Sequence, residues 1–405
     1  MNSRCYDVAV IGGGIVGMST AMALTERFHL SLIVLEKEER LAVHQSGNSS
    51  GVIHSGVYYK PRSLKAQYCI EGREALVRFC EGHGIPFRRC GNVIVAVHER
   101  ELLVLEELIQ RGEANGLQGL KRLRTEEIHE FEPYAGGIAG LWVPQTGVVD
   151  YTQVTYAYAN LVQKSRGVVQ TGARLYGFRR YPGEFLLETT KGEVLCHNLI
   201  NCGGLQSDRI ARMCGVDPGI QIIPFRGEYY SLNPECQNLI RNLIFPVPEP
   251  NLPFLGAHFT RRIEGKVEVG PNAVLALKRE GYHPWSFSGV DSLQIALYIG
   301  FWRMARNHWR RGVGEFYRSV RKRAFWKSLK RLIPELGIDD IQWKRAGIRA
   351  QAVEPTGLLV DDFRVIHGER MVHVLNAPSP AATASIMIGR AIARMAGENF
   401  GLRGK

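Results

Sequence analysis

Three glycines near the N-terminus constrain this chain more than any other feature of its sequence. Gly12, Gly14 and Gly17 form the pattern G-x-G-x-x-G between a short apolar run, Tyr6–Ile11, and a helical pattern, Ile15–Arg27. The first glycine permits a tight turn, the second lets backbone approach a pyrophosphate, and the third lets helix and strand pack closely. Free N–H groups at the start of the helix then face the phosphates. The pattern predicts a dinucleotide-binding strand–turn–helix unit.

An acidic residue completes this unit. The apolar run Leu30–Leu35 predicts a second strand, and Glu36 closes it, 19 residues after Gly17. A carboxylate at this position accepts hydrogen bonds from a ribose hydroxyl and repels a 2′-phosphate, which disfavours NADP. The fingerprint does not distinguish FAD from NAD. The next segment, His44–His54 (HQSGNSSGVIH), favours FAD, because a loop of small hydroxyl residues and glycine can pass under an isoalloxazine ring.

Alternating strand and helix patterns indicate the fold class. With 405 residues, the chain is too long for one ordinary core. We predict an α/β protein with a Rossmann-like FAD-binding domain, built from discontinuous segments, and an inserted sheet-based substrate domain. The first domain is assigned residues 1–85, 145–218 and 340–405, and the second residues 86–144 and 219–339. Further strands are expected at Val93–Val97, Leu199–Cys202, Val267–Val269 and Met371–Leu375, and further helices at Leu64–His83, Glu99–Asn115, Tyr151–Ser165 and Ala381–Ala396.

Cysteine and apolar patterns bear on location. The eight cysteines form no C-x-x-C pair and no zinc-like spacing, so we expect free thiols in a reducing cytosol and no metal site. No signal peptide is recognised, and no stretch has the roughly 18 apolar residues that span a bilayer. We expect a cytoplasmic protein that can lie on the inner face of the cytoplasmic membrane.

Motifs spread along the chain carry a family resemblance. Residues 1–36 and 46–59 resemble the D-amino-acid oxidase/glycerol-3-phosphate dehydrogenase class of flavoenzymes. Six motifs are similar to L-2-hydroxyglutarate dehydrogenase/oxidase: GVIHSGVYY (51–59), PFRGEY (224–229), FLGAHFTR (254–261), VGPNAVL with KREG (269–281), AGIRAQAV (346–353) and NAPSPAA (376–382). Two features depart from the family: Asn48-Ser49 stands where His-Asn is expected, and residues 285–331 are unusually basic and rich in Trp.

The resemblance implies FAD as cofactor and oxidation of L-2-hydroxyglutarate to 2-oxoglutarate, with electrons passed to a membrane quinone or to oxygen. An amino-acid or glycerol-3-phosphate oxidoreductase on the same fold is the alternative within enzymes. A flavin-bearing nucleic-acid-binding protein is the alternative of another class. Only the basic segment favours it, and we expect no nucleic-acid partner.

Oxidation of a 2-hydroxy acid requires a base and cations that hold carboxylates. Histidine suits the base near neutral pH, and His54 and His258 are rival candidates for that role. Arginine holds carboxylates with two hydrogen bonds. Arg226 and Arg349, in apolar contexts that contain glycine, are the first candidates, and Arg261 and Lys278 are weaker ones. Among tyrosines that can donate a hydroxyl, Tyr59 is the candidate substrate ligand, beside Tyr58 and Tyr229.

Further residues are predicted to bind the cofactor. Ser46 and Ser50 belong to the serine-rich loop, and the Gly203–Gly204 turn lets backbone approach the cofactor. By resemblance, the backbone near Leu175 reaches the adenine. Ser379 is predicted to cap a helix that has Pro380 at its first position and includes Ala381, with the positive end of its dipole toward the flavin.

A basic and aromatic segment, residues 285–331, contains eleven Lys or Arg and one acid, Glu315, from residue 301 onward, in a chain of net charge +12. The basic residues are Arg303, Arg306, Arg310, Arg311, Arg318, Arg321, Lys322, Arg323, Lys327, Lys330 and Arg331. Four tryptophans and Phe301, Phe316, Tyr317 and Phe325 lie among them. An amphipathic helix with Trp and Phe on one face is typical of a protein that binds an anionic membrane surface. A solvated helix pair and a nucleic-acid-binding surface remain alternatives.

Overall fold

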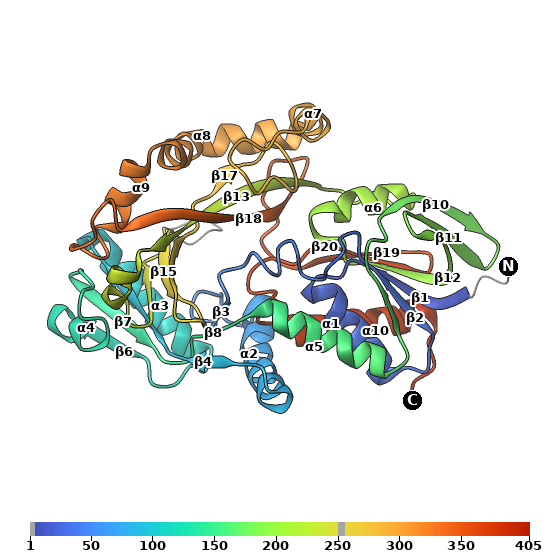
Figure 1. Cartoon of the computed structure of the whole chain (residues 1–405), viewed down its shortest axis with the longest axis horizontal. Coiled ribbons are helices and arrows are strands. Elements are labelled where there is room, and N and C mark those ends of the chain that lie inside the picture. The colour runs from blue at the N-terminus through green and yellow to red at the C-terminus, as the bar shows by residue number, and fades with distance from the viewer. Residues whose placement is uncertain (1–4, 250–255) are drawn as a thin grey trace.

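The computed structural model describes residues 5–249 and 256–405. Phe254 and Leu255 of the motif FLGAHFTR fall outside these residues. Two large sheets lie side by side, each with its own layer of helices, and chain segments cross between them several times (Figure 1). The fold is α/β, and both sheets draw strands from widely separated parts of the sequence.

The first sheet holds the dinucleotide fingerprint. Its central strands are parallel, with short antiparallel hairpins at one side. The strands are, in spatial order, β10 (Leu175–Tyr181), β11 (Glu184–Thr189), β12 (Gly192–Asn201), β1 (Cys5–Ile11), β2 (Leu32–Leu35) and β9 (Val168–Gln170), with β20 (Met371–Asn376) on β12 and β19 (Arg364–Gly368) on β20. β1 lies between β12 and β2, so the turn after β1 opens at the carboxyl edge of parallel strands, where α/β sheets bind ligands.

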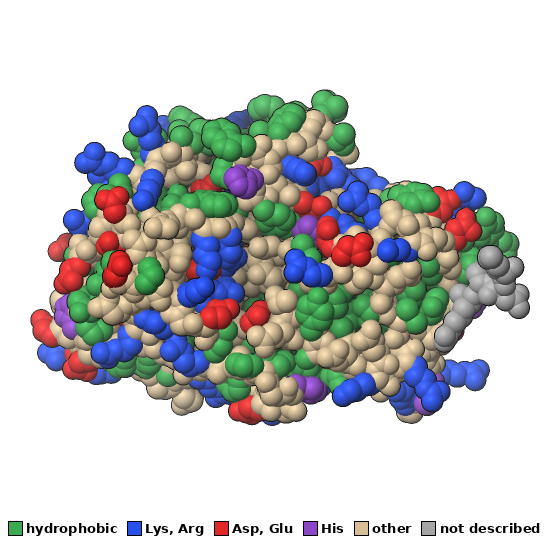
Figure 2. All heavy atoms as spheres, viewed as in Figure 1, with side chains coloured by type: hydrophobic (Ala, Val, Ile, Leu, Met, Phe, Trp, Pro, Cys, Tyr) green, Lys and Arg blue, Asp and Glu red, His purple; other side chains and the backbone are tan. Residues whose placement is uncertain are grey.

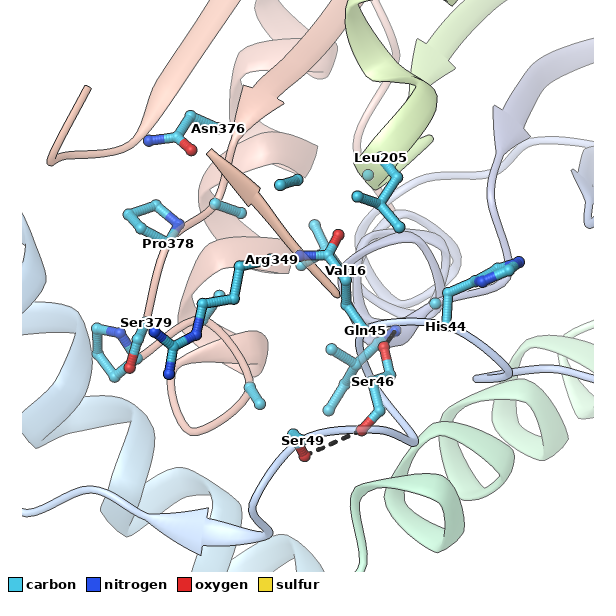
Figure 3. Close-up of a pocket in the computed structure, with 18 of the residues that line it drawn as sticks. Val16, His44, Gln45, Ser46, Ser49, Leu205, Arg349, Asn376, Pro378 and Ser379 are labelled. Carbon is cyan, nitrogen blue, oxygen red and sulfur yellow. Dashed lines mark hydrogen bonds between the residues drawn. The ribbon is translucent and has the colours of Figure 1, made fainter. Parts of the chain in front are cut away.

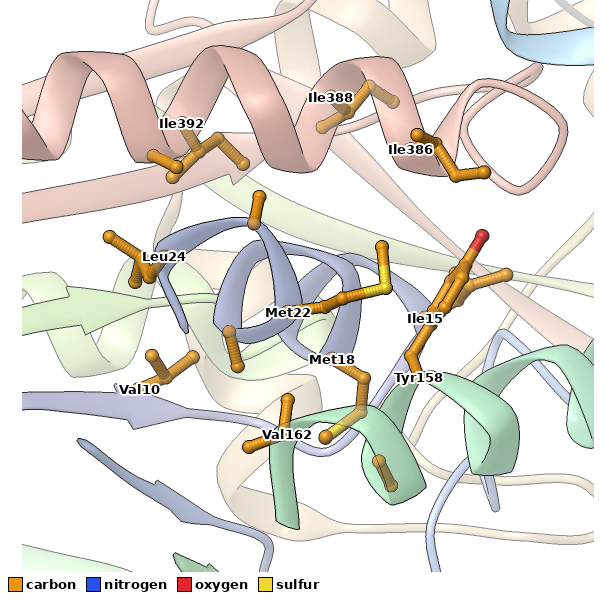
Figure 4. Close-up of a cluster of buried hydrophobic side chains, with 14 of the residues drawn as sticks. Val10, Ile15, Met18, Met22, Leu24, Tyr158, Val162, Ile386, Ile388 and Ile392 are labelled. Carbon is orange, nitrogen blue, oxygen red and sulfur yellow. The ribbon is translucent and has the colours of Figure 1, made fainter. Parts of the chain in front are cut away.

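Helices cover one face of this sheet. α1 (Ile15–Arg27) packs against α10 (Ser385–Phe400) and α5 (Tyr151–Lys164), and α2 (Leu64–His83) packs on α10. Apolar residues of α1, α5 and α10 interdigitate in a fully buried core (Figure 4). Gly389 permits the close contact of α10 with α1, because a Cβ there would lie 2.6 Å from backbone atoms of Ser19. α6 (Ser207–Met213) follows a short 3-10 turn, Gly204–Gln206.

The second sheet is larger and mostly antiparallel. Its strands are, in order, β17 (Val274–Leu275), β13 (Gln221–Leu232), β16 (Val267–Gly270), β15 (His258–Arg261), β14 (Leu243–Pro246), β5 (Asn92–Ala96), β7 (Ala139–Val143) and β6 (Lys121–Arg124), with β18 (Ile341–Val353) on β13. A small sheet of β3 (Val52–Ile53), β8 (Gly147–Val149) and β4 (Phe87–Arg89) joins the two. The helices beside the second large sheet are α3 (Leu102–Ala114), α4 (Thr125–Phe131), α7 (Gly289–Leu297), α8 (Ile299–Val320) and α9 (Lys322–Leu329), with 3-10 turns at Glu99–Glu101 and Pro234–Leu239.

Three sequence expectations differ from the structure. Residues from 340 onward were assigned to the FAD-binding domain, but β18 pairs with β13 along its length and so belongs to the second sheet. The last helix begins at Ser385, not at Ala381, and Ser379 does not cap it. The turns between Pro378 and Ala384 intervene, with a bond from the N–H of Ala381 to the carbonyl of Pro378. Phe325 and Trp326 face inward: Phe325 is buried, and Trp326 donates to the carbonyl of Leu336.

The remaining aromatic residues of the basic segment are mostly exposed. The inner faces of α7 and α8 rest on β13 and β18 through Ile295, Met304 and the partly buried Phe301. Across residues 5–249 and 256–405, no helix combines the length and the apolar character that a membrane span requires.

Candidate functional site

One continuous cavity of about 1400 Å³ reaches both the glycine fingerprint and the two candidate histidines. It exceeds the roughly 300–1000 Å³ of ordinary ligand pockets, so a dinucleotide and a small substrate fit together. Residues from both large sheets line it (Figure 3). Fourteen of the predicted site residues contribute: Gly12, Gly14, Glu36, Ser46, Ser50, His54, Tyr59, Leu175, Gly203, Gly204, His258, Arg349, Ser379 and Ala381.

The fingerprint turn is built as the glycine spacing requires. Gly12 has φ +111°, and a Cβ there would lie 2.5 Å from the carbonyl oxygen of Cys202. A Cβ on Gly17 would lie 1.9 Å from the carbonyl oxygen of Gly12, so Gly17 supports the turn from behind without lining the cavity. Only glycine fits either position. The turn therefore brings bare backbone to the cavity wall.

Glu36 is fixed beside this turn. One carboxylate oxygen accepts from the N–H of Gly13 at 2.6 Å, and the other accepts from the N–H of Glu38 at 2.9 Å. Each carboxylate oxygen has a second lone pair. The side chain is buried at the cavity edge, so it can still accept ribose hydroxyls there.

The serine-rich loop connects the fingerprint with the second sheet. The Oγ of Ser46 accepts from the N–H of Ile15 at 2.9 Å, which caps the first turn of α1. Backbone carbonyls of Asn48 and Ser49 accept hydrogen bonds from Arg345 of β18 and from Arg262, which directly follows β15. The loop is therefore held from both sides as it passes along the cavity.

Ser379 lies between two candidate residues. Its Oγ is 3.4 Å from Nε2 of His54 and 3.5 Å from the hydroxyl of Tyr59. The backbone N–H of His54 donates to Thr383, and its carbonyl accepts from Cys69. These two bonds fix the backbone that carries the ring. Burial lowers the pKa of His54 to about 4. The ring is neutral at pH 7.

His258 approaches the cavity from β15. Its Nδ1 lies 3.0 Å from the carbonyl oxygen of Gly256, and its ring packs on Phe245 with centroids 4.3 Å apart. A carbonyl only accepts, so Nδ1 carries the proton and Nε2 keeps its lone pair. Burial lowers the pKa of His258 to about 4, against the opposing effect of the Gly256 bond and with smaller contributions from Arg349 and His54.

Arg349 supplies a cation to the same wall. Its side chain reaches from β18 into the cavity toward the turn that holds Pro378 and Ser379 (Figure 3). Burial lowers its pKa, but an arginine remains charged at neutral pH. Tyr229, also on the cavity wall, is close enough for its hydroxyl to act on this pKa. Arg349 is therefore placed to hold a carboxylate near His258.

The other candidate cations do not line the cavity. Arg226 is buried and pairs with Glu228 at 3.0 Å. Arg261 donates to backbone carbonyls of Gln237, Ile240 and Gly265. Lys278 is exposed. The expectation that these residues bind substrate gains no support from their positions.

Sequence reasoning missed several residues of the cavity wall. Lys60 and Arg111 line it near Tyr59, and Arg111 donates to the carbonyl of Tyr58 at 3.0 Å. Lys37 and Glu280 line it near Glu36 and pair at 2.5 Å. Lys37 directly follows the fingerprint acid, which could have drawn attention to it, but Arg111 lies in an ordinary amphipathic helix and carries no local signal.

The residues present fit FAD. The glycine turn, the α1 N-terminus and Glu36 suit a pyrophosphate and a ribose, and Leu175 and the Gly203–Gly204 turn line the same cavity. The cavity continues to His54, His258 and Arg349, where a flavin ring and a substrate would meet.

Comparison with known proteins agrees with this geometry. The sequence profile described as FAD dependent oxidoreductase matches residues 7–395. The structure is similar to the L-alpha-glycerophosphate oxidase of Mycoplasma pneumoniae, solved with FAD bound, with a TM-score of 0.81, 24% identity and coverage of 99% of this chain and 96% of that one. Glycine oxidase from Geobacillus kaustophilus gives a TM-score of 0.72, 17% identity and coverage of 98% and 96%. At such identities these likenesses concern the fold.

Sequence relatives are more specific. The chain is 46% identical to the L-2-hydroxyglutarate dehydrogenase of Indibacter alkaliphilus, over 98% of this chain and all of the relative. It is 43% identical to the mitochondrial L-2-hydroxyglutarate dehydrogenase of Homo sapiens, over 99% of this chain and 90% of the relative. The chain therefore belongs to the FAD-dependent oxidoreductases and, within them, to the L-2-hydroxyglutarate dehydrogenase family.

Proposed function

We propose that this chain oxidises L-2-hydroxyglutarate to 2-oxoglutarate. The observation that carries the proposal is the high identity to L-2-hydroxyglutarate dehydrogenases over nearly the whole chain. The cavity wall supports it with two neutral histidines and a partly buried arginine in the cavity that also holds the fingerprint. The reaction removes a hydride from C2 and a proton from its hydroxyl. FAD, when bound, supplies the hydride acceptor.

We assign the proton to His258. Its Nδ1 is committed to the Gly256 carbonyl, which leaves Nε2 as an acceptor of the substrate hydroxyl proton. Nε2 of His54 faces Ser379 instead, at 3.4 Å. His54 and Tyr59 are assigned to hydrogen bonding around the substrate through this serine.

A dicarboxylate needs two cations. Arg349 is assigned to the carboxylate next to C2, because it shares a wall with His258. Arg111 and Lys60, which line the cavity near Tyr59, are the candidates for the distal carboxylate.

Reduction of the bound flavin tests the substrate. L-2-hydroxyglutarate, its D-isomer, glycerol-3-phosphate and a panel of amino acids are added anaerobically in turn, and the flavin absorbance is followed. We expect loss of the yellow colour with the L-isomer alone. Bleaching by an amino acid or by glycerol-3-phosphate would keep the fold and overturn the substrate.

We also propose that the enzyme works at an anionic membrane surface and passes its electrons to a membrane quinone, with oxygen as the alternative acceptor. Support comes from the outer face of α7, α8 and the preceding loop, where large apolar side chains are exposed (Figure 2). Trp285 is 90% exposed and Leu297 76%. Others are Phe287, Val290, Leu293, Ile299, Trp302, Trp309, Val313, Phe316, Tyr317 and Val320.

Positively charged residues lie beside this apolar face. Trp309, Val313, Phe316 and Val320 are spaced as one stripe of α8. Exposed cations flank the stripe: Arg306, Arg310, Arg321 and Arg323. An apolar face with a basic border suits the boundary between lipid headgroups and acyl chains. A nucleic acid would use the arginines but leave the aliphatic residues of α7 without a role.

A further inference from the structure

The strongest unassigned feature is a cluster of charges behind the serine-rich loop, here called the arginine tie and defined as Arg262, Glu268 and Arg345. Arg345 on β18 donates to the carbonyl of Asn48 at 2.8 Å and to that of Ser49 at 3.0 Å. Arg262 donates to the carbonyl of Ser49 at 3.1 Å. Two cations thus hold two successive carbonyls of the loop between the fingerprint and His54.

Glu268 holds the arginines in place. It is 3% exposed, and Arg345 donates to its two carboxylate oxygens at 2.7 and 3.3 Å. A guanidinium nitrogen of Arg262 lies 3.6 Å from a carboxylate oxygen of Glu268. Burial pushes the pKa of Glu268 up, but hydrogen bonds and charges, chiefly from Arg345, hold it below its ordinary value. The guanidinium of Arg345 also stacks on Tyr229, 4.2 Å from the ring centroid.

The arginine tie lies on or directly beside the strands that carry His258 and Arg349. Arg345 and Arg349 are four residues apart on β18, so they share a face of the strand. Glu268 lies opposite Thr260 on β15, the strand that carries His258. Between the two arginines, a Cβ on Gly347 would lie 2.8 Å from the carbonyl oxygen of Asn48. The strand and the loop are therefore in direct backbone contact.

The loop is fastened on its other side to the fingerprint, through the bond from Ile15 to Ser46. We propose that Arg345 and Arg262, anchored by Glu268, are positioning residues that fix the Ser46–Ser50 loop for FAD and set its place against the wall of His258 and Arg349. Charged donors suit this task, because their bonds to carbonyls are stronger than neutral ones. The inference rests on the proposed function only in requiring that FAD binds at this loop.

Replacement of Arg345 tests the tie. Arg345→Lys keeps the charge but cannot bridge both carbonyls and Glu268, and Arg345→Met removes the charge as well. In both variants we expect the Kd for FAD to rise about tenfold or more, as the loss of charge-assisted bonds predicts. The visible circular dichroism of the bound flavin should change. With L-2-hydroxyglutarate, kcat should fall about tenfold or more while KM changes little, because small misplacements penalise the reacting geometry.

Lys344 supplies the matched control. Its Nζ lies 3.0 Å from Glu268, but within the described residues it makes no hydrogen bond to the loop. Lys344→Met should bind FAD like the unaltered protein, with the same flavin spectrum. Hydrogen exchange over residues 42–53 of the FAD-loaded protein should rise in Arg345→Lys and stay unchanged in Lys344→Met.

The outcomes are separable from the choice of substrate, because FAD affinity, dichroism and hydrogen exchange need none. A lower melting temperature in Arg345→Lys, with unchanged FAD affinity, flavin spectrum and loop exchange, would mean that the cluster only stabilises the fold, and the proposal would fail. Equal effects of Lys344→Met and Arg345→Met would also overturn it, because the loop bonds would then be irrelevant. Glu268→Gln, which unbalances the cations, should reproduce the Arg345→Lys phenotype.

Discussion

Nε2 of His54 lies 3.4 Å from the Oγ of Ser379, whereas His258 uses its other ring nitrogen, Nδ1, for its bond to Gly256. The two histidines are both neutral at pH 7, so charge does not distinguish them. The hydrogen bonds of the two rings do distinguish them. Only His258 has its proton position fixed by a partner that cannot donate.

Replacement of each histidine should therefore have unequal effects. His258→Ala should lower kcat/KM about 100- to 10 000-fold, the range expected for a lost general base. His54→Ala should cost less and should act mainly through KM. Steady-state kinetics with L-2-hydroxyglutarate and a soluble dye would measure both. A larger loss in His54→Ala would exchange the two assignments.

Arg349 should be sensitive even to a conservative change. Arg349→Lys keeps the positive charge but loses the bidentate fork. We expect KM for L-2-hydroxyglutarate to rise about 10- to 100-fold, as for the loss of a charged hydrogen bond in a buried site. Arg226→Lys serves as the comparison: because Arg226 lies off the cavity, KM should hardly change, although the protein will be less stable.

The difference between these two arginines shows where sequence reasoning stops. Each lies in an apolar motif that contains glycine, so the sequence alone predicts both equally as carboxylate ligands. In the β13–β18 ladder, Arg349 is paired with Phe225, and Arg226 with Ile348. Adjacent residues of a strand point to opposite faces, so the register places the two arginines on opposite sides of the sheet. That register depends on long-range pairing, which a local motif does not contain.

Short sequence motifs predicted the structure correctly where the constraints act between residues close together in the chain. The fingerprint glycines, Glu36 and the strands and helix around them follow from a short stretch of sequence, because the positive φ of Gly12 and the contact of Gly17 with Gly12 arise within the turn. The prediction that Ser379 caps the last helix is wrong because the position of this serine depends on distant parts of the chain. Ser-Pro before an apolar run is a good helix start, but the chain makes turns up to Ala384, and the serine faces His54 and Tyr59, which lie more than 300 residues earlier in the chain.

Gly17 offers a test of the turn. Gly17→Ala would place a Cβ 1.9 Å from the carbonyl oxygen of Gly12, so the helix must move away from the strand. We expect FAD affinity to fall at least about 100-fold, because the phosphate-facing backbone moves with it. Gly82→Ala in α2 is the control, since its Cβ would meet nothing within 4 Å. It should gain up to about 1 kcal/mol of stability from better helix propensity, with unchanged FAD affinity.

Acid should destabilise this protein through three histidines that lie in buried or partly buried surroundings. Burial lowers the pKa of His54, His258 and His373 to about 4. The ordinary value is about 6.5, so between pH 6.5 and 4 the unfolded chain binds more protons than the folded one. The contribution of these histidines to the free energy of unfolding is complete above pH 6.5 and is lost as pH falls, by up to roughly 1.4 kcal/mol per pH unit for each histidine. Glu132, whose pKa burial raises to about 7, acts in the opposite direction.

Urea unfolding at pH 7, 6 and 5 measures this dependence. His373 does not line the cavity, so His373→Gln removes one titrating group without changing a side chain of the cavity wall. The variant is expected to lose less stability than the unaltered protein between pH 6.5 and 5, by about the contribution of one histidine. Parallel curves for the two proteins would contradict the expectation for His373.

The exposed apolar face of α8, with the exposed cations of α8 and of the start of α9, should determine membrane attachment. The triple change Arg306→Gln, Arg310→Gln and Arg323→Gln removes about 1 kcal/mol of attraction per cation to an anionic surface. We expect binding to vesicles of anionic lipid to weaken about 100-fold, with turnover of a soluble dye unchanged, because none of these residues lines the cavity. Trp309→Ser with Phe316→Ser should weaken binding even to neutral vesicles, since it removes apolar contact.

A control with equal charge separates this surface from net charge. Arg122, Lys164 and Arg403 are exposed on other elements. Their replacement by Gln also removes three positive charges and should leave vesicle binding nearly intact. If the two triple variants behave alike, attachment depends on overall charge and not on the cations of α8 and α9. If neither variant nor the unaltered protein binds vesicles, while Arg306, Arg310 and Arg323 are needed to retain DNA or RNA at low salt, the membrane proposal is wrong and the basic segment serves a nucleic acid.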